Sequence, residues 1–466
     1  MRMVFLMVDT LRYDHLGAAG NPTGYTPELD ALAEDSFFFE NYYISSFPTV
    51  PNREDIMCGT YSFPDHGWGP LPPEAVPVAQ ILAEKKYICQ LITDTPHLIG
   101  RGHGYHRGFH AYHWLRGHEC DTYLTRLNHP VEQVMPPGKT RMDESYFGHP
   151  LVDLHYWINE ERSWEEETFV ADTARLVSKW IEDNYKAKDT FLWVDDFECH
   201  EPWVPPRYYL DRLDPKYRGF DVAYPNYGPS SVYTRAELRN MQARYAGEVC
   251  LTSKWIGHIL RKLKDVGIYD DSLIVFQADH GTYLGDRGRT GKFHLDRKTG
   301  KIVPWPQYDE INHIPLMIKL PGQTKGKRIK EIVQPVDLLP TILDLAKLKV
   351  GLNFHGYSMR PLLEGKTSKW PRKYAYSTFS IQDEEPNFWT TITTKGWSVN
   401  VGGYHDEDPE VFDTRKDPGQ RRNLVKSKRS VAARVLKDYV RFLESVDTAP
   451  GKVAMYEPAL RRMTRS

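Results

Sequence analysis

Short apolar runs alternate with longer amphipathic segments over residues 1–364 of this 466-residue chain, and no other feature of the sequence restricts the fold as strongly. The apolar runs are residues 4–8, 87–92, 191–194 and 273–276. Helices are expected at residues 26–35, 74–85, 166–184 and 235–266. Strands that alternate with helices are typical of a parallel sheet with both faces covered. The sequence therefore predicts an α/β fold with a mostly parallel central sheet flanked by helices.

Polar residues follow each apolar run directly. They are Asp9-Thr10, residues 93–97, residues 195–200 and Asp279-His280-Gly281. In open α/β sheets the ligand crevice lies outside the carboxyl ends of the strands. Four segments that are distant in the sequence are therefore expected to meet at one site.

A second region is expected to begin near residue 365. Its antiparallel strands are predicted at residues 374–380, 389–394 and 397–401, and a closing amphipathic helix at residues 429–445. The predicted organisation is a large α/β domain over residues 1–364 and a smaller C-terminal α+β subdomain over residues 365–466.

The charge balance and the cysteines exclude several classes of protein. The chain has 60 basic and 62 acidic residues, which gives no reason to expect nucleic acid or an anionic membrane as partner. Five cysteines without a CxxC pair indicate reduced thiols in a cytoplasmic protein. The apolar run before Asp9 is too short for a secretory signal or a membrane span. We expect a cytoplasmic protein that binds neither nucleic acid nor membrane.

The stretch over residues 102–150 is rich in His, Gly, Tyr and Arg and has little periodicity. Its histidines suggest a zinc site, but the stretch is broken by glycines and lacks a ligand pattern. We interpret it as an excursion over the rim of the site, with residues 116–119 helping to shape the pocket mouth. The histidines concerned are His103, His106, His110, His113 and His118.

Several motifs, taken in order, resemble the sulfatase family of the alkaline phosphatase superfamily along almost the whole chain. Thr49-Val50-Pro51-Asn52-Arg53 is similar to the family signature Cys/Ser-x-Pro-x-Arg, with Thr49 at the Cys/Ser position. The other matching segments are residues 8–12, 26–33, 267–281, 308–310, 336–341, 355–358 and 411–418. The resemblance implies an alkaline phosphatase/sulfatase-like fold and the metal-dependent hydrolysis of a small anionic ester.

One divalent metal ion is implied by the resemblance, with Asp9, Asp279, His280 and the Thr49 oxygen as ligands. An aspartate at a strand end is alternatively a helix N-cap, but the Asp-His-Gly context favours a metal ligand. Similar sulfatases usually have a second Asp where Thr10 stands and often Asn where His280 stands. Fewer carboxylates and an imidazole favour Mn²⁺ or Zn²⁺, with Ca²⁺ as the alternative.

A second metal ion is a looser expectation. Nucleotide pyrophosphatase/phosphodiesterase members of the superfamily hold one with a DxxxH segment and a later His-Gly. This chain has Asp196 and His200 at that spacing, and His355-Gly356 later. In sulfatases the equivalent of His200 contacts the substrate instead, so both interpretations stay open.

Thr49 determines which chemistry is expected. Sulfatases oxidise Cys or Ser to formylglycine, whereas threonine has a methyl group on its carbinol carbon and cannot form that aldehyde. Thr49 must therefore act as a plain alkoxide that forms a covalent ester, which water then cleaves. Phosphoryl transfer tolerates this route, while a sulfated threonine is a poorer intermediate to discharge. The alternative is an inert turn residue in a chain that has lost its chemistry.

Four more residues match family positions around the substrate. Arg53, four residues after Thr49 on the same helix, is expected to hold the nucleophile or an anionic oxygen. The resemblance places His97 near the nucleophile and His200 and Lys292 on the substrate. Either histidine is a candidate to protonate the leaving group.

Three functions compete at this stage. The leading hypothesis is a phosphodiester or phosphonate monoester hydrolase without formylglycine, and the second is a sulfatase that works without formylglycine. The third is a non-catalytic, metal-binding member of the fold. Relatives of this size often self-associate, so a homo-oligomer is an open alternative.

Overall fold

The computed structural model describes residues 1–22, 25–119, 121, 123–124, 132–141, 150–381, 388–402 and 408–464. The chain forms two compact units that interleave in sequence. The first comprises Met1–Phe38, Ala79–Lys301 and Pro315–Arg328, and the second Phe39–Val78, Ile302–Ile314 and Ile329–Ser466. Each unit is therefore built from several separate segments, whereas the sequence predicted a single domain boundary near residue 365.

An eight-stranded mixed sheet forms the centre of the first unit, in the order β13-β2-β12-β7-β1-β5-β3-β4. The strands from β7 to β4 run parallel, and β12 is antiparallel to β7 and β2. The strands are β1 (Arg2–Val8), β2 (Phe37–Phe39), β3 (Ile88–Thr93), β4 (Ala111–Trp114), β5 (Thr190–Asp196), β7 (Ser272–Ala278), β12 (Leu316–Lys319) and β13 (Lys327–Ile329). The predicted mostly parallel sheet is confirmed.

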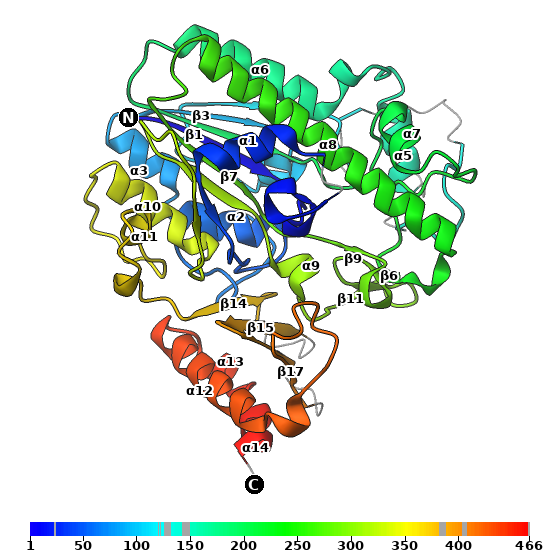
Figure 1. Ribbon diagram of the computed structural model, residues 1–466, viewed down its shortest axis with the longest axis vertical. Coiled ribbons are helices and arrows are strands. Elements are labelled where there is room, and N and C mark those ends of the chain that lie inside the picture. The colour runs from blue at the N-terminus through cyan, green and yellow to red at the C-terminus, as the bar shows by residue number, and fades with distance from the viewer. Residues whose placement is uncertain are drawn as a thin grey trace. The chain divides into compact units, whose positions relative to one another are not determined.

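The central strands are apolar because both faces of the sheet are covered. Every residue of β5 and β7 is buried, as is every residue of β1 after Arg2. The long helices α6 and α8 pack against each other, and α6 packs on β3 and β5 (Figure 1). The helices of this unit are α1 (Pro27–Asp35), α3 (Val78–Glu84), α4 (Pro96–Ile99), α5 (Leu151–Ile158), α6 (Phe169–Asn184), α7 (Arg207–Leu213) and α8 (Arg235–Asp265).

Strand β4 corrects the interpretation of residues 102–150 as an excursion only. Residues 111–114 pair in parallel with β3 and form the edge of the main sheet. Three of the four residues of β4 are exposed, so the strand has no apolar run by which the sequence could reveal it. The short strands β6 (Gly228–Pro229), β8 (Tyr283–Leu284) and β9 (Arg289–Gly291) form a separate sheet, and β10 (His294–Asp296) and β11 (Lys301–Val303) are also short.

The second unit contains the predicted antiparallel sheet and closing helix. Its strands are β14 (Tyr374–Thr378), β15 (Trp389–Thr394), β16 (Trp397–Gly402) and β17 (Glu410–Phe412), each antiparallel to the next. Helices α12 and α14 share one apolar core with this sheet, where the rings of Tyr376 and Phe442 stack at 4.1 Å (Figure 1). The helices are α2 (Thr49–Cys58), α9 (Asp309–Asn312), α10 (Leu338–Leu345), α11 (Arg360–Leu363), α12 (Arg429–Ser445), α13 (Pro450–Ala454) and α14 (Glu457–Thr464).

Across the described ranges, no helix is both long enough and apolar enough to cross a membrane. The cysteines in those ranges, Cys58, Cys89, Cys199 and Cys250, are buried free thiols.

Helix α12 offers a direct test of this packing. Leu436 is fully buried in the core of the second unit, whereas Lys437 on the same helix is exposed. Leu436→Ala is expected to lower the free energy of unfolding by about 2–5 kcal/mol, because the cavity adds to the lost transfer free energy. Lys437→Ala is expected to change it by less than about 0.5 kcal/mol. Urea denaturation followed by circular dichroism measures both, and equal effects would contradict the packing.

Candidate active site

Two buried aspartates lie side by side because β1 and β7 are parallel neighbours. Val8 pairs with Ala278 at the carboxyl ends of these strands, so Asp9 and Asp279 follow at the same edge of the sheet. Both carboxylates are fully buried. The backbone N–H of Thr10 donates to Asp279 Oδ1 over 2.9 Å, across 269 positions of sequence. The predicted convergence at the carboxyl edge is therefore present for β1 and β7.

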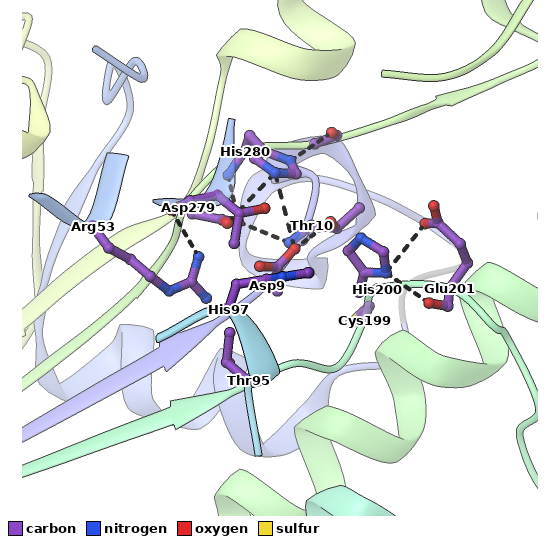
Figure 2. A network of polar contacts seen from close by, with 12 residues as sticks. Asp9, Thr10, Arg53, Thr95, His97, Cys199, His200, Glu201, Asp279 and His280 are labelled. Carbon is purple, nitrogen blue, oxygen red and sulfur yellow. Dashed lines mark hydrogen bonds and ion pairs between the residues drawn. The ribbon is translucent and has the colours of Figure 1, made fainter. Parts of the chain in front are cut away.

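His280 completes this group with a defined ring nitrogen. Its Nδ1 lies 3.0 Å from the carbonyl oxygen of Gly281, which accepts the Nδ1 proton. Nε2 therefore carries the lone pair, and it lies 3.9 Å from Asp9 Oδ1 and 3.5 Å from Asp279 Oδ2 (Figure 2). Burial lowers the pKa of His280 to about 3, so the ring is neutral at neutral pH.

The donor set fits a divalent cation. Ligand atoms of Asp9, Asp279 and His280 all lie within 4.8 Å of one another, and no other group of three or more His, Cys, Asp or Glu among the described residues does so. Two carboxylates and an imidazole lone pair repel each other in a buried site unless a cation lies between them. A cation about 2.0–2.2 Å from each ligand atom would place those atoms roughly 3–4 Å apart. The distances from His280 Nε2 to the carboxylates of Asp9 and Asp279, 3.9 and 3.5 Å, agree with this.

Thr10 acts on one of the ligands instead of adding a charge. Its backbone is left-handed, with φ of 59°, and its Oγ1 donates to Asp9 Oδ1 over 2.6 Å. A hydroxyl in this place orients the Asp9 carboxylate, where a second aspartate would add a further negative charge. The structure thus places Asp9, Asp279 and His280 together, which are three of the four metal ligands that the sequence predicted.

Thr49 and Arg53 belong to the second unit. Every residue of α2 is buried, and Thr49 is its first residue. The Arg53 guanidinium, fully buried, donates from Nη1 to the Thr49 carbonyl oxygen over 3.1 Å. The side chain of Arg53 therefore folds back to the first turn of its own helix, as the four-residue spacing predicted.

His97 and His200 follow β3 and β5 in the first unit. His200 is buried, its ring stacks on Phe197 at 4.1 Å, and its Nδ1 donates to the Glu201 carbonyl oxygen over 2.6 Å (Figure 2). Burial lowers the pKa of His200, and the charge of Lys292 lowers it further. The neutral ring of His200 consequently carries its lone pair on Nε2.

Lys292 is the buried cation of this region. It follows β9. Burial is the largest cause that lowers the pKa of His97 and of His280, and the positive charge of Lys292 lowers both further. The charge of Lys292 thus affects three imidazoles, those of His97, His200 and His280.

Two models of protein families match the chain. One described as Sulfatase covers residues 2–348, and one described as N-sulphoglucosamine sulphohydrolase, C-terminal, covers residues 306–445. The chain belongs to the sulfatase family. Members of this family are ester hydrolases that use a divalent metal ion, and the buried Asp/Asp/His group supplies a site for one.

Relatives and solved structures cover nearly the whole of this sulfatase-family enzyme. An arylsulfatase of Clostridium perfringens is 25% identical over 464 residues, which is 91% of this chain and 90% of the relative. Phosphonate monoester hydrolases of Agrobacterium radiobacter and Silicibacter pomeroyi superpose with TM-scores of 0.72 and 0.71, at 22% and 21% identity. These alignments cover 96% and 97% of this chain and 95% and 96% of theirs, and they confirm the predicted fold.

The second-metal set of this sulfatase-family enzyme stays a prediction. Asp196 is fully buried, and burial together with Asp94 raises its pKa. His355 belongs to the second unit, where its Nδ1 accepts the N–H of Tyr61 over 3.0 Å.

Residues 116–119 were expected to shape the pocket mouth, but His118 and Glu119 lie in the interior. His118 Nδ1 lies 3.0 Å from Asp94 Oδ2, and its ring stacks on Phe169 at 4.2 Å. Glu119 contacts His97 through Oε2 and Arg141 through Oε1. The sequence did not single out Arg141, because it lies in a stretch without periodicity and outside any family motif.

Removal of one metal ligand tests the site. Asp279→Asn is expected to abolish tight binding of the divalent ion and to lower kcat/KM at least 100-fold, because one of the two charges that hold the ion is lost. The matched control is Asp271, an exposed residue just before the first residue of β7, at the end of the strand away from Asp279. Asp271→Asn should bind metal normally. Metal analysis and thermal unfolding with and without added Mn²⁺ or Zn²⁺ measure this. At 100 times Kd the ion should stabilise wild type by about 2.7 kcal/mol. Equal metal content in Asp279→Asn would contradict the site.

Proposed function

We propose that this enzyme hydrolyses phosphodiesters or phosphonate monoesters with Thr49 as nucleophile. The observation that carries the proposal is the residue type at position 49, in the segment Thr49-Val50-Pro51-Asn52-Arg53. Thr49 is buried at the start of α2, and the buried Arg53 donates to its carbonyl oxygen. The proposed metal ligands are Asp9, Asp279 and His280, with Thr49 Oγ1 as the fourth.

The side chain of threonine limits the chemistry. Its carbinol carbon bears a methyl group, so oxidation would give a ketone and never the aldehyde that formylglycine requires. The hydroxyl must therefore attack phosphorus itself, forming a Thr49–O–P bond as the bond to the leaving oxygen breaks. Water then attacks the same phosphorus and releases the Thr49 hydroxyl. Both steps are in-line displacements, so one set of cationic groups serves both.

The remaining residues have separate roles in this proposal. A divalent ion would supply charge neutralisation and a lowered hydroxyl pKa. Lys292 and Arg53 would hold the anionic oxygens of the substrate. His200, with Nδ1 engaged by Glu201, presents Nε2 as the nitrogen that exchanges a proton with the leaving group or with water.

Similarity to known proteins supports two ester classes unequally. The solved structures named above are phosphonate monoester hydrolases, which agrees with attack at phosphorus. The arylsulfatase relative favours a sulfuric ester instead, which is the second candidate function. Threonine at position 49 argues against the second candidate, because a sulfated threonine has no second hydroxyl through which it can collapse.

A panel of esters distinguishes these candidates. Metal-loaded enzyme should hydrolyse bis(4-nitrophenyl) phosphate or 4-nitrophenyl phenylphosphonate with a kcat/KM at least 100-fold above that for 4-nitrophenyl sulfate. The reverse order would establish the sulfuric ester hydrolase and overturn the proposal. No turnover of any ester by metal-loaded protein would also overturn it and would favour a binding role.

Substitutions at position 49 test the nucleophile. Thr49→Val keeps the shape of the side chain and removes only the hydroxyl, so turnover should fall by about 10⁴-fold or more. Thr49→Ser keeps the hydroxyl and should retain measurable turnover. Mass spectrometry of acid-quenched wild-type enzyme should detect a phosphorylated peptide containing residue 49. Thr49→Val with unchanged kcat would show that another group attacks the ester.

A further inference from the structure

Glu119 is a buried carboxylate with three polar partners in the first unit. Its side chain is 1% exposed. Its Oε2 lies 3.1 Å from His97 Nε2, and its Oε1 accepts the Tyr224 hydroxyl at 2.7 Å and lies 3.3 Å from Arg141 Nη2. Both oxygens are thus engaged, Oε2 by His97 and Oε1 by Tyr224 and Arg141.

The backbone at Glu119 is also unusual. Its φ is +42°, in the left-handed region, which is unfavourable for a non-glycine residue. Burial of a charged side chain adds a further cost. A residue that is both buried and left-handed is held in place by its side-chain contacts. One of these contacts is with His97, which belongs to the proposed active site.

We propose that Glu119 is a positioning residue that fixes the ring of His97 and stabilises its protonated form. The proposal rests on the proposed function insofar as His97 serves ester hydrolysis. A carboxylate that accepts the Nε2 proton holds the neutral ring in one tautomer, with the lone pair on Nδ1. The ring of His97 then has one tautomer and one orientation.

The charges around His97 oppose one another. Burial lowers the pKa of His97, and the charges of Lys292 and Arg141 lower it further, whereas the hydrogen bond and charge of Glu119 raise it. Burial acts to raise the pKa of Glu119, but His200, Arg141 and His97 together hold it well below its ordinary value. Glu119 is therefore ionised at neutral pH, and it is the group that favours a protonated His97.

Arg141, which contacts Glu119, also lies near two aromatic rings. Its guanidinium lies 5.1 Å from the ring centroids of both Tyr224 and Tyr227. Tyr224 in turn donates its hydroxyl to Glu119. The carboxylate is thus held through Oε1 while Oε2 contacts His97, so its position is set before any substrate binds.

Titration of His97 by NMR tests the proposal without any need for turnover. In metal-loaded protein with ¹³C-labelled histidine, the His97 signal is identified by its absence in His97→Gln. Glu119→Gln keeps the size and removes the charge, so the titration midpoint of His97 should fall relative to wild type. Glu119→Asp keeps the charge and should restore part of the shift. Tyr224→Phe, which removes the other hydrogen bond of Glu119, should leave the midpoint close to wild type. An unchanged or raised midpoint in Glu119→Gln would overturn the proposal.

A double-mutant cycle on the best ester then separates positioning from structural support. Glu119→Gln should lower kcat/KM about 10–100-fold and move the alkaline limb of its pH profile to lower pH, because a protonated His97 is lost earlier as pH rises. In the His97→Gln background the same substitution should cost less than about 2-fold, because Glu119 acts through His97. Losses that simply multiply, with a lowered thermal midpoint, would show a structural role. A failure of Thr49 as nucleophile would leave this cycle intact, since it uses whichever ester wild type hydrolyses.

Discussion

The pairing of β1 with β7 is the constraint on which the metal site depends. Parallel register puts Val8 beside Ala278, so the next residue on each strand is an aspartate at the same buried edge. The imidazole of His280 adds a lone pair 3.5 Å from the Asp279 carboxylate. Such a group is electrostatically unfavourable by itself, and a divalent cation removes the repulsion. The fold therefore holds these three side chains together, as a site for a divalent cation would require.

The pKa values of the histidines near the proposed ligands depend on the residues that surround the segments after β3 and β5. His97 and His200 follow neighbouring strands of one sheet, and both rings lose basicity through burial and through Lys292. Glu119 counteracts this effect at both histidines, and at His97 it adds a hydrogen bond to its charge. Two histidines with different partners are suited to different proton-transfer roles, because the pKa of each is set by its own neighbours.

Strongly apolar elements were predictable from the sequence, whereas exposed ones were not. The runs around β1, β5 and β7 predicted their strands within two residues at each end, because strands buried on both faces consist of apolar residues. The exposed edge strand β4 left no such pattern. Asp9 and Asp279 were predicted as metal ligands from the Asp-His-Gly motif and the family order, because an aspartate at a strand end is by itself equally a helix N-cap.

By itself, the sequence determined the α/β class, the family and the threonine at position 49, and it predicted Asp9, Asp279 and His280 as metal ligands, because each is written in local pattern or in a motif. Only the tertiary structure decided that Glu119 is buried beside His97 and that Arg141 joins it. These contacts join residues of an irregular stretch to α4, and no periodic pattern in the sequence indicates them. Long-range packing of irregular segments depends on side-chain shape and charge in three dimensions, which a linear pattern does not contain.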